Sequence, residues 1–365
     1  MKVPVAKPAL IGNEKQYVME CLETEWISSN GKYIAKFEEA FSQYIGVKHA
    51  LTCSNGTVAL HLPLLAMGIG PGDEVIVPTL TYIATANAVK YVGADAVFVD
   101  CEQDTWNICV KDVEAKITPK TKAIIVVHLY GHPVVMDPIM ALAKKHNIYV
   151  IEDCAESLGA TYSGLQTGSV GHVGTFSFFG NKTITTGEGG MVTTNDDGLA
   201  ARMRLLKGQG MDPNRRYWHT VVGYNYRMTN IQAAIGLAQL ENVEWHLTQR
   251  RRIAEKYSQE IEKRKLPVTI QKTSDNTTHS YWMFTVLLDK QDEKYRDLII
   301  SKMAELGVET RPIFYPMHLM PPHFVSKTFK NAEEIAAAGI NLPTFSQLSD
   351  DQLDYVISTL EKVLN

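Results

Sequence analysis

The chain has 365 residues, of which 45% are hydrophobic and 21% are charged, and it carries a formal net charge of −4 at pH 7. The length suits one large domain with a smaller one, and such a chain can bury a core that needs no disulfide bonds. The small negative charge excludes electrostatic attraction to nucleic acid or to an acidic membrane as the basis of function.

The five cysteines are odd in number and form no CxxC pair; they are Cys21, Cys53, Cys101, Cys109 and Cys154. We interpret them as reduced thiols in a cytoplasmic protein. The N-terminal sequence MKVPVAKPALIGNEKQ has no continuous apolar stretch, so a signal peptide is not expected. No segment approaches the ~20 apolar residues that a membrane helix needs, so no membrane partner is expected.

Short apolar runs rich in β-branched residues predict strands along the first half of the chain, at residues 49–53, 74–78, 96–100, 122–128, 149–154 and 174–179. Helical patterns lie between several of them, at residues 57–67, 82–91 and 138–146. Alternating strands and helices are typical of βαβ units, so we predict an α/β fold with a mostly parallel central sheet. Ligands bind at the carboxyl ends of the strands in such sheets.

The sequence GEGGMVTTN at residues 187–195 predicts a turn that leads into a further strand. A long helical pattern then runs from Asn230 to about Glu262, and we place a domain boundary inside it, near Glu244. The prediction is a large domain of residues 1–244 and a small C-terminal α+β domain of residues 245–365. The small domain is expected to have a strand near 281–288 and helices near 292–306 and 350–363.

The sequence SNGT at residues 54–57 follows a predicted strand and begins an apolar helix. Gly56 permits a tight turn, and Thr57 is a candidate helix cap. The free N–H groups and the dipole of such a helix attract a phosphate. An ordinary capped turn between a strand and a helix is the alternative interpretation.

Asp153, in IEDCAES, lies at the carboxyl end of a predicted buried strand. A buried carboxylate needs a partner, and a protonated ring nitrogen of a cofactor would be one. The alternative role for Asp153 is a helix N-cap. Glu156 lies three residues later, where it is expected either to reach the same cavity or to form a capping box with Asp153.

Lys182 follows another predicted strand, in TFSFFGNKTITTGEGG. A lysine in a walled, partly dry site has a lowered pKa and becomes a nucleophile, whereas the alternative is an exposed lysine in a turn. Ser177, five residues earlier, is suited to donate to a phosphate. The order of phosphate turn, strand-end aspartate, serine and lysine favours the catalytic interpretation. Tyr82 is expected to stack on a flat ring or to pack in the core.

Two motifs are discounted. GIGPG at residues 68–72 precedes a predicted strand, whereas a dinucleotide-binding loop follows one. His128 and His132 are four residues apart, but Gly131 and Pro133 interrupt any helix that would align them. The remaining histidines lack metal-ligand spacing, so no metal site is predicted.

Together these motifs resemble the sugar-nucleotide aminotransferases of the DegT/DnrJ/StrS type, which are fold-type I enzymes dependent on pyridoxal 5′-phosphate (PLP). The resemblance extends from WISSNGKYIAKFEEAF (26–41) through SNGTVALH, PTLTYIATANA, HLYGHP, IEDCAES, SFFGNKTITTGEGG and GYNYRMTNIQAAIGLAQL to GVETRPIFYPMH (307–318) and NLP (341–343). It implies transfer of an amino group to a nucleotide-linked keto sugar. FFGNKTITTGEGG with KGQG and YWH is most similar to members that aminate GDP-4-keto-6-deoxymannose at carbon 4, with glutamate as the donor.

The resemblance implies a role for each matching residue of the cofactor site. Lys182 would bind the PLP aldehyde covalently and then carry protons, and Asp153 would pair with the pyridine nitrogen. Gly56, Thr57 and Ser177 would hold the phosphate, and Tyr82 would stack on the ring. Glu156 stands where relatives often have Gln or His near the 3-oxygen of the cofactor.

Asn225, in GYNYRMT, would by the same resemblance reach the phosphate of the cofactor in a neighbouring subunit. This implies a homodimer with shared active sites and leaves a higher oligomer open. The candidate contacts to the sugar nucleotide are Trp26, Ser28, Ser29, Tyr217, Arg311, Tyr315 and His318, with Trp218 beside them. An arginine suits a pyrophosphate, but packing is an equal alternative for each of these residues.

Two alternatives to this function remain, an aminotransferase for another sugar nucleotide and a non-catalytic regulator, and two others are discounted. The nearest is an aminotransferase for a UDP- or dTDP-linked keto sugar. A PLP-dependent sugar dehydratase would have histidine in place of Lys182, and a dinucleotide-dependent dehydrogenase would have a glycine fingerprint after its first strand. A non-catalytic regulator on the same fold would have lost Lys182, Asp153 or Ser177. The resemblance further implies a product destined for a surface polysaccharide such as O-antigen, or for a glycosylated natural product.

Overall fold

The computed structural model describes residues 1–365 and has a seven-stranded central sheet. The strand order is β1-β9-β8-β5-β4-β2-β3. The strands are β1 (His49–Cys53), β2 (Glu74–Pro78), β3 (Asp95–Val99), β4 (Thr121–Val127), β5 (Tyr149–Asp153), β8 (Val173–Ser177) and β9 (Gly190–Thr194). Only β9 runs antiparallel to its neighbours, so the predicted mostly parallel α/β sheet is confirmed.

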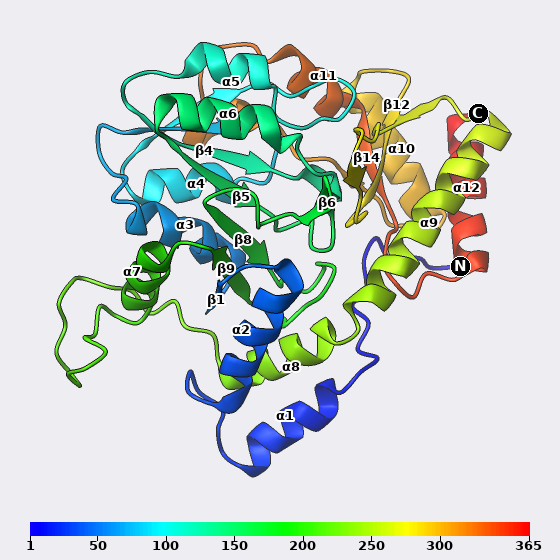
Figure 1. The fold of residues 1–365 in the computed structure, drawn as a ribbon. Helices are drawn as coiled ribbons and strands as arrows, with labels where there is room; N and C mark the ends of the chain where they lie inside the picture. The colour runs from blue at the N-terminus through cyan, green and yellow to red at the C-terminus, as the bar shows by residue number, and fades with distance from the viewer.

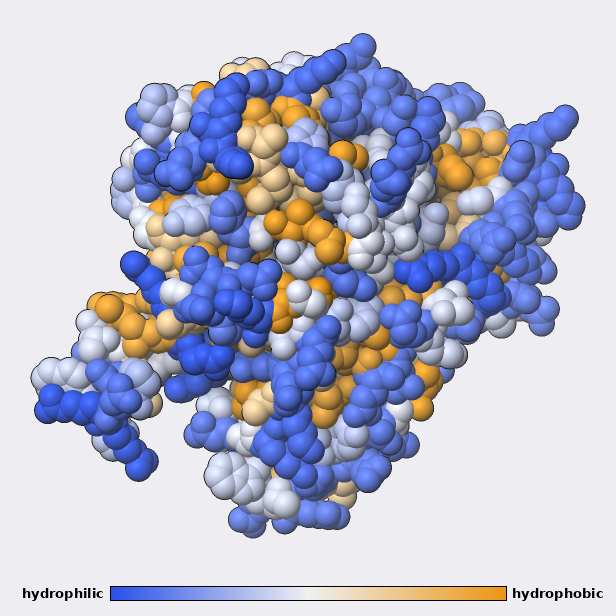
Figure 2. Space-filling model, viewed as in Figure 1, coloured by the Kyte–Doolittle hydropathy of each residue, from blue (hydrophilic) through white to orange (hydrophobic).

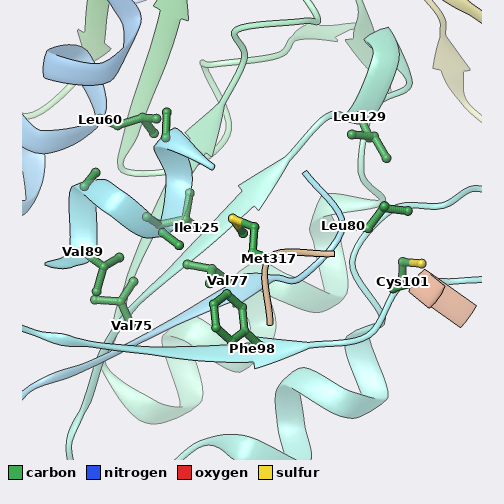
Figure 3. Packing of buried hydrophobic residues seen from close by; sticks show 14 of the residues in the cluster. Leu60, Val75, Val77, Leu80, Val89, Phe98, Cys101, Ile125, Leu129 and Met317 are labelled. Atoms are coloured by element: carbon green, nitrogen blue, oxygen red, sulfur yellow. The ribbon is translucent and has the colours of Figure 1, made fainter. Parts of the chain in front are cut away.

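Helices cover both faces of this sheet (Figure 1). They are α2 (Lys32–Ile45), α3 (Gly56–Ala66), α4 (Ala84–Tyr91), α5 (Val110–Lys116), α6 (Met136–His146), α7 (Asp197–Lys207) and α8 (Asn230–Leu240). Because side chains alternate along a strand, Val75 and Val77 of β2 pack into one core and Ile76 packs into another. Figure 3 shows the first core, where Leu60, Val89 and Met317 surround the strand residues. Two covered faces explain why the strands are continuous apolar runs.

The sequence locates the strands well but misassigns one helix cap. Strands β1 and β2 have the predicted bounds, and β3, β4, β5 and β8 differ from the prediction by one or two residues at their ends. Helix α3 begins at Gly56, and Asn55 caps it by accepting the Val58 N–H at 3.0 Å. The expected cap, Thr57, is instead the second residue of the helix, because Asn55 already occupies the extended N-cap position before it.

The helix predicted over residues 230–262 is two helices, so that prediction is wrong. Helix α8 ends at Leu240, and α9 (Val243–Arg264) begins after Glu241 and Asn242. The Asn242 side chain donates to the Ala238 carbonyl at 3.0 Å, which satisfies a free acceptor at the end of α8. The proposed domain boundary near Glu244 lies just after this break and stays a prediction.

The C-terminal part contains a second, antiparallel sheet with the order β10-β12-β14-β13. Its strands are β10 (Val268–Ile270), β12 (Phe284–Leu288), β13 (Arg311–Pro312) and β14 (Gly339–Leu342), and α9, α10 (Glu293–Glu305), α11 (Lys330–Ala338) and α12 (Asp350–Leu364) accompany it. The N-terminal residue Val3 bridges to Val308 and packs into the same core. The expected mixture of helices and strands is therefore present.

The remaining elements connect the two sheets or lie at the periphery. They are α1 (Glu14–Glu23), the short helices η1 (Leu129–Gly131), η2 (Met317–Leu319) and η3 (Pro321–His323), and a small sheet of β6 (Thr161–Tyr162), β7 (Leu165–Gln166) and β11 (Thr277–Thr278). The segment between α7 and α8, residues 208–229, projects from the body as an arm (Figures 1 and 2). None of the helices combines the length and apolarity needed to span a membrane.

Candidate active site

A cavity of about 690 Å³ lies at the carboxyl ends of β5 and β8, where the C-terminal part of the chain meets the central sheet. Residues from the first part form one wall, among them Asp153, Ser177 and Lys182. Trp282 and Arg311 belong to the opposite wall. The position agrees with the rule that ligands bind at strand carboxyl ends, and the cavity is large enough for a small organic cofactor.

The N-terminus of α3 and the end of β8 form a cradle for an anion. A β-carbon at position 56 would lie 2.6 Å from the Ser177 Cβ and 2.9 Å from its Oγ, so only glycine permits this approach. Gly56 and Thr57 are the first two residues of α3, and their N–H groups have no partner within the helix. A hydroxyl beside a helix N-terminus in a cavity suits a phosphate group.

Asp153 is almost fully buried at the inner end of the cavity and lacks a cationic partner in contact. Its Oδ2 accepts from the Thr85 hydroxyl at 2.9 Å, and its Oδ1 accepts from the Ala155 N–H at 3.2 Å. Burial raises the pKa of Asp153, while these hydrogen bonds and the charge of Lys182 oppose the rise. No helix begins after Asp153, so the alternatives of an N-cap and of a capping box with Glu156 are wrong.

Glu156 and Lys182 are the other two ionisable groups at this end of the cavity. The Glu156 Oε2 accepts from the Tyr130 N–H at 2.7 Å. Burial raises the pKa of Glu156 to about 7, against the charge of Lys182. Burial lowers the pKa of Lys182, against Glu156 and Asp153. Lys182 is therefore not an exposed lysine in a turn but a buried amine with a lowered pKa in the same cavity as two acids.

Two further predicted residues line the cavity from more exposed positions. Tyr82 is 58% exposed and its ring lies against Phe314, so the alternative of core packing is wrong. Arg311 lines the other side, and its guanidinium donates to Glu309 at 3.0 Å. Whether either residue contacts a ligand stays a prediction.

The other predicted contacts do not line the cavity of this chain. Asn225 lies on the arm, with exposed Tyr217 and Trp218. Trp26 belongs to a separate surface hollow beside α2, and Ser28 accepts from the Asn230 N–H through its carbonyl. The predicted contacts that do not line the cavity are Trp26, Ser28, Ser29, Tyr217, Asn225, Tyr315 and His318. Whether any of these residues contacts a ligand stays a prediction.

His318 and Tyr315 have packing roles in place of the predicted contacts. The His318 ring is fully buried, and its two nitrogens lie 2.7 Å from the Thr79 hydroxyl and 3.2 Å from Glu333. The Tyr315 hydroxyl accepts from Arg296 at 3.0 Å. His318 therefore has no free nitrogen to offer a substrate.

Thr85, Asn181, Glu188 and Trp282 are among the cavity-lining residues that sequence reasoning missed. Asn181 and Glu188 lie inside the glycine-rich motif of Lys182, and their polarity in that motif was an available signal. Thr85 lies one helical turn from Tyr82. Trp282 comes from a strand-like segment one hundred residues downstream, and nothing local in the sequence indicates that it faces Lys182.

One buried group of metal-type side chains lies behind the site, formed by His128, Glu152 and Cys154. The His128 ring contacts Glu152 at 3.0 Å and accepts the Val134 N–H at 2.9 Å. The Glu152 carboxylate also accepts backbone N–H groups of residues 168, 170 and 171. Because these bonds occupy the ligand atoms, we assign the group to holding β4, β5 and the start of β8 together.

Comparison with known proteins agrees with this geometry. The model of the DegT/DnrJ/EryC1/StrS aminotransferase family matches residues 8–361. The chain is 56% identical over 365 residues to the GDP-perosamine synthase of Caulobacter vibrioides, and the alignment covers 100% of this chain and 98% of the relative. It is 52% identical over 363 residues to the GDP-perosamine synthase of Escherichia coli O157:H7, and this alignment covers 99% of this chain and 98% of the relative.

Among solved structures, the aminotransferase of Psychrobacter cryohalolentis superposes with a TM-score of 0.91 at 34% identity, covering 98% of both chains. The likeness thus extends over nearly the whole chain in sequence and in fold. The chain belongs to the DegT/DnrJ/EryC1/StrS aminotransferase family.

Proposed function

We propose that this aminotransferase uses PLP to convert GDP-4-keto-6-deoxymannose into GDP-perosamine, with glutamate as the amino donor. The observation that carries the proposal is the arrangement of Lys182, Asp153 and the Gly56–Ser177 cradle around one cavity. The GDP-linked sugar is supported by the two relatives named GDP-perosamine synthase, each of which aligns with nearly the whole chain.

The residues present fit PLP at both ends of the cofactor. The space that a β-carbon at Gly56 would fill is left open beside the Ser177 hydroxyl, which suits the phosphate. Asp153 is a buried carboxylate without a cation in contact, which suits a protonated pyridine nitrogen. Lys182 supplies the amine between them. When bound there, PLP supplies an aldehyde that carries the amino group and a ring that withdraws electrons from the reacting carbon.

The chain's own residues would divide the work of two half-reactions. Lys182, with its lowered pKa, would take the α-proton of glutamate and later give a proton to the sugar carbon. Asp153 would keep the ring nitrogen protonated through its negative charge. Gly56, Thr57 and Ser177 would fix the phosphate, so that the reacting atoms stay beside Lys182. Because the donor leaves before the sugar binds, we expect ping-pong kinetics.

Glu156 would share the cavity with the 3-oxygen of the cofactor. A carboxyl with a pKa of about 7 is neutral for part of the time at physiological pH, and a neutral carboxyl can donate to an anionic oxygen. The like-charge repulsion that a permanently ionised glutamate would cause is thereby reduced. A glutamate is therefore compatible with this position, where relatives often have an amide or an imidazole.

We further propose a homodimer with shared active sites. The arm of residues 208–229 carries side chains that a single chain leaves in solvent, including Tyr217 at 76% and Val222 at 90% exposure. Asn225 lies on the same arm and does not line the cavity of its own chain. A second copy of the chain would cover this surface and bring Asn225 to the phosphate. A cytoplasmic location is in keeping with five unpaired thiols.

The test is a transamination assay with the purified chain, glutamate and a panel of keto sugars linked to GDP, UDP or dTDP. We expect formation of 2-oxoglutarate and of an amino sugar with GDP-4-keto-6-deoxymannose, and no turnover by Lys182→Ala. Turnover with a UDP- or dTDP-linked sugar alone would contradict the substrate assignment. Turnover by Lys182→Ala at the rate of the unmodified chain would contradict the mechanism.

A further inference from the structure

Trp282 presents the face of its indole ring to the amine of Lys182. The Lys182 Nζ atom lies 3.7 Å from the ring centroid, and both side chains line the cavity. The amine makes no hydrogen bond or ion pair with Asp153 or Glu156, although the charges of both act on it. The ring is therefore the direct contact of the amine in this structure.

The position of Trp282 is fixed from several sides. Its indole N–H donates at 2.8 Å to the carbonyl of Asn181, the residue before Lys182. Its own carbonyl accepts from Arg250 at 2.8 Å. Its ring lies parallel to that of Tyr130, with an interplanar angle of 11° and 6.2 Å between centroids. A tryptophan held in this way cannot turn its ring face away from Lys182 without breaking these contacts.

The turn at Tyr130 and Gly131 brings the Trp282 backbone into place. Gly131 has a φ of 103°, and a β-carbon there would lie 2.9 Å from the Tyr281 nitrogen and 3.1 Å from the Trp282 nitrogen. Tyr130 has a φ of 57°, a conformation that costs a residue with a side chain about 1 kcal/mol or more. The same Tyr130 donates its N–H to Glu156. The turn thus helps to position both Glu156 and the Trp282 ring in the cavity of Lys182.

We propose that Trp282 is a positioning residue that holds the ε-ammonium group of Lys182 by a cation–π contact whenever the lysine is protonated and not linked to the cofactor. This inference rests on the proposed function, in which glutamate displaces the lysine from the cofactor and the lysine stays free through both proton transfers. A free lysine must stay beside the reacting carbon and must still exchange its proton. A ring attracts the cation but cannot accept its proton, whereas a carboxylate in contact could take it.

The charged groups that face the same cavity are Asp153, Glu156, Glu188 and Arg311. All four remain when Trp282 alone is replaced, so a variant isolates the contribution of the ring. The ring stabilises the charged form of Lys182, and its removal should lower the pKa of the amine. For a contact screened from water, the expected fall is about one pH unit, or tenfold in the dissociation constant.

The experiment measures the pKa of Lys182 by competitive labelling with acetic anhydride over a range of pH, read by mass spectrometry of the peptide. The full-length enzyme is labelled as purified and again after addition of glutamate, which should free the lysine. The variants are Trp282→Leu, which has no ring, and Trp282→Phe, which has a ring of weaker attraction. Trp245→Leu on α9, outside the cavity, is the matched control for loss of a tryptophan.

We expect a fall of about one unit in Trp282→Leu, a smaller fall in Trp282→Phe and no change in Trp245→Leu. An unchanged or raised pKa in the Trp282 variants would overturn the proposal. A merely structural role of Trp282 would not make the fall in the Lys182 pKa follow the strength of the ring at position 282. If Trp282→Leu fails to fold, Trp282→Phe decides by the same criterion. If glutamate does not increase labelling of Lys182 in the unmodified enzyme, the proposed function fails, and the pKa comparison on the purified chain still tests Trp282.

Discussion

Gly56, the first residue of α3, lies against Ser177 at the end of β8, and a β-carbon on residue 56 would come within 2.6 Å of the Ser177 Cβ. The helix can therefore approach the strand only without a side chain at this position. The approach places a hydroxyl beside the free N–H groups of the first helical turn. Under the proposed function, this pair would hold the phosphate of the cofactor.

Replacing Gly56 by alanine should separate the helix from the strand and open the cradle. We expect Gly56→Ala to weaken PLP binding by more than tenfold, since hydrogen bonds to a charged group contribute about 1.5–3 kcal/mol each. Titration of the purified chain with PLP, followed by absorbance, measures the loss. Ser177→Gly removes the atoms that the new β-carbon meets, so adding Gly56→Ala to Ser177→Gly should cost little more. Additive losses in the double variant would contradict the steric explanation.

Replacing Asp153 by asparagine removes a charge without removing volume. The side chain can still accept from Thr85, so we expect the fold to be kept. The ring nitrogen would lose its anionic partner, and we expect the rate of each half-reaction to fall by about a hundredfold, or ~2.7 kcal/mol in barrier. Stopped-flow absorbance of the glutamate half-reaction measures this. A variant with the rate of the unmodified enzyme would show that Asp153 does not act on the ring.

Glu156 should make stability depend on pH. Its pKa rises from an ordinary value of 4.5 to about 7 in the folded chain because it is buried. Between these values the folded state binds more protons than the unfolded state, so the free energy of unfolding contributed by Glu156 is present at low pH and is lost as pH rises through 7. We expect Glu156→Gln to gain up to about 3 kcal/mol over the unmodified chain between pH 4 and pH 8. Urea unfolding at several pH values tests this, and parallel stability curves would contradict it.

The shared active site can be tested by mixing two inactive variants. Lys182→Ala damages the site of its own chain, and Asn225→Ala is expected to damage the site of the neighbouring chain. Mixed dimers would contain one site with both changes and one with neither, so the mixture should recover about a quarter of the normal activity. Subunit exchange after mild denaturation, followed by the transamination assay, measures the recovery. A mixture as inactive as its components would show that each site is built from one chain.

The outcome at particular residues shows what local sequence can predict here. Strands β1 and β2 were found at the predicted bounds because both faces of the sheet are covered and each strand is one uninterrupted apolar run. The positions of Asp153 and Lys182 in the cavity could be predicted because Asp153 ends such a strand and Lys182 comes five residues after another. The break at Asn242 was missed because the helical pattern continues across it, and one side-chain bond to Ala238 decides it.

The contacts that depend on distant segments were beyond local prediction. Trp282 reaches Lys182 because Gly131 lets two backbone segments approach, about 150 residues apart in the chain. His318 ends the motif TRPIFYPMH, from which a substrate contact was predicted, but Thr79 and Glu333 occupy its nitrogens. Tyr217 and Val222 of the arm are left in solvent by a single chain, so the role proposed for the arm depends on an assembly that a single sequence does not describe.

The central claim is a covalent bond between the ε-nitrogen of Lys182 and the aldehyde of PLP, and reduction with borohydride tests it most directly. Treatment of the purified enzyme followed by peptide mass spectrometry should find a pyridoxyl group on the peptide that contains Lys182 and on no other lysine. Absence of the adduct, or its presence on a different lysine, would contradict the account.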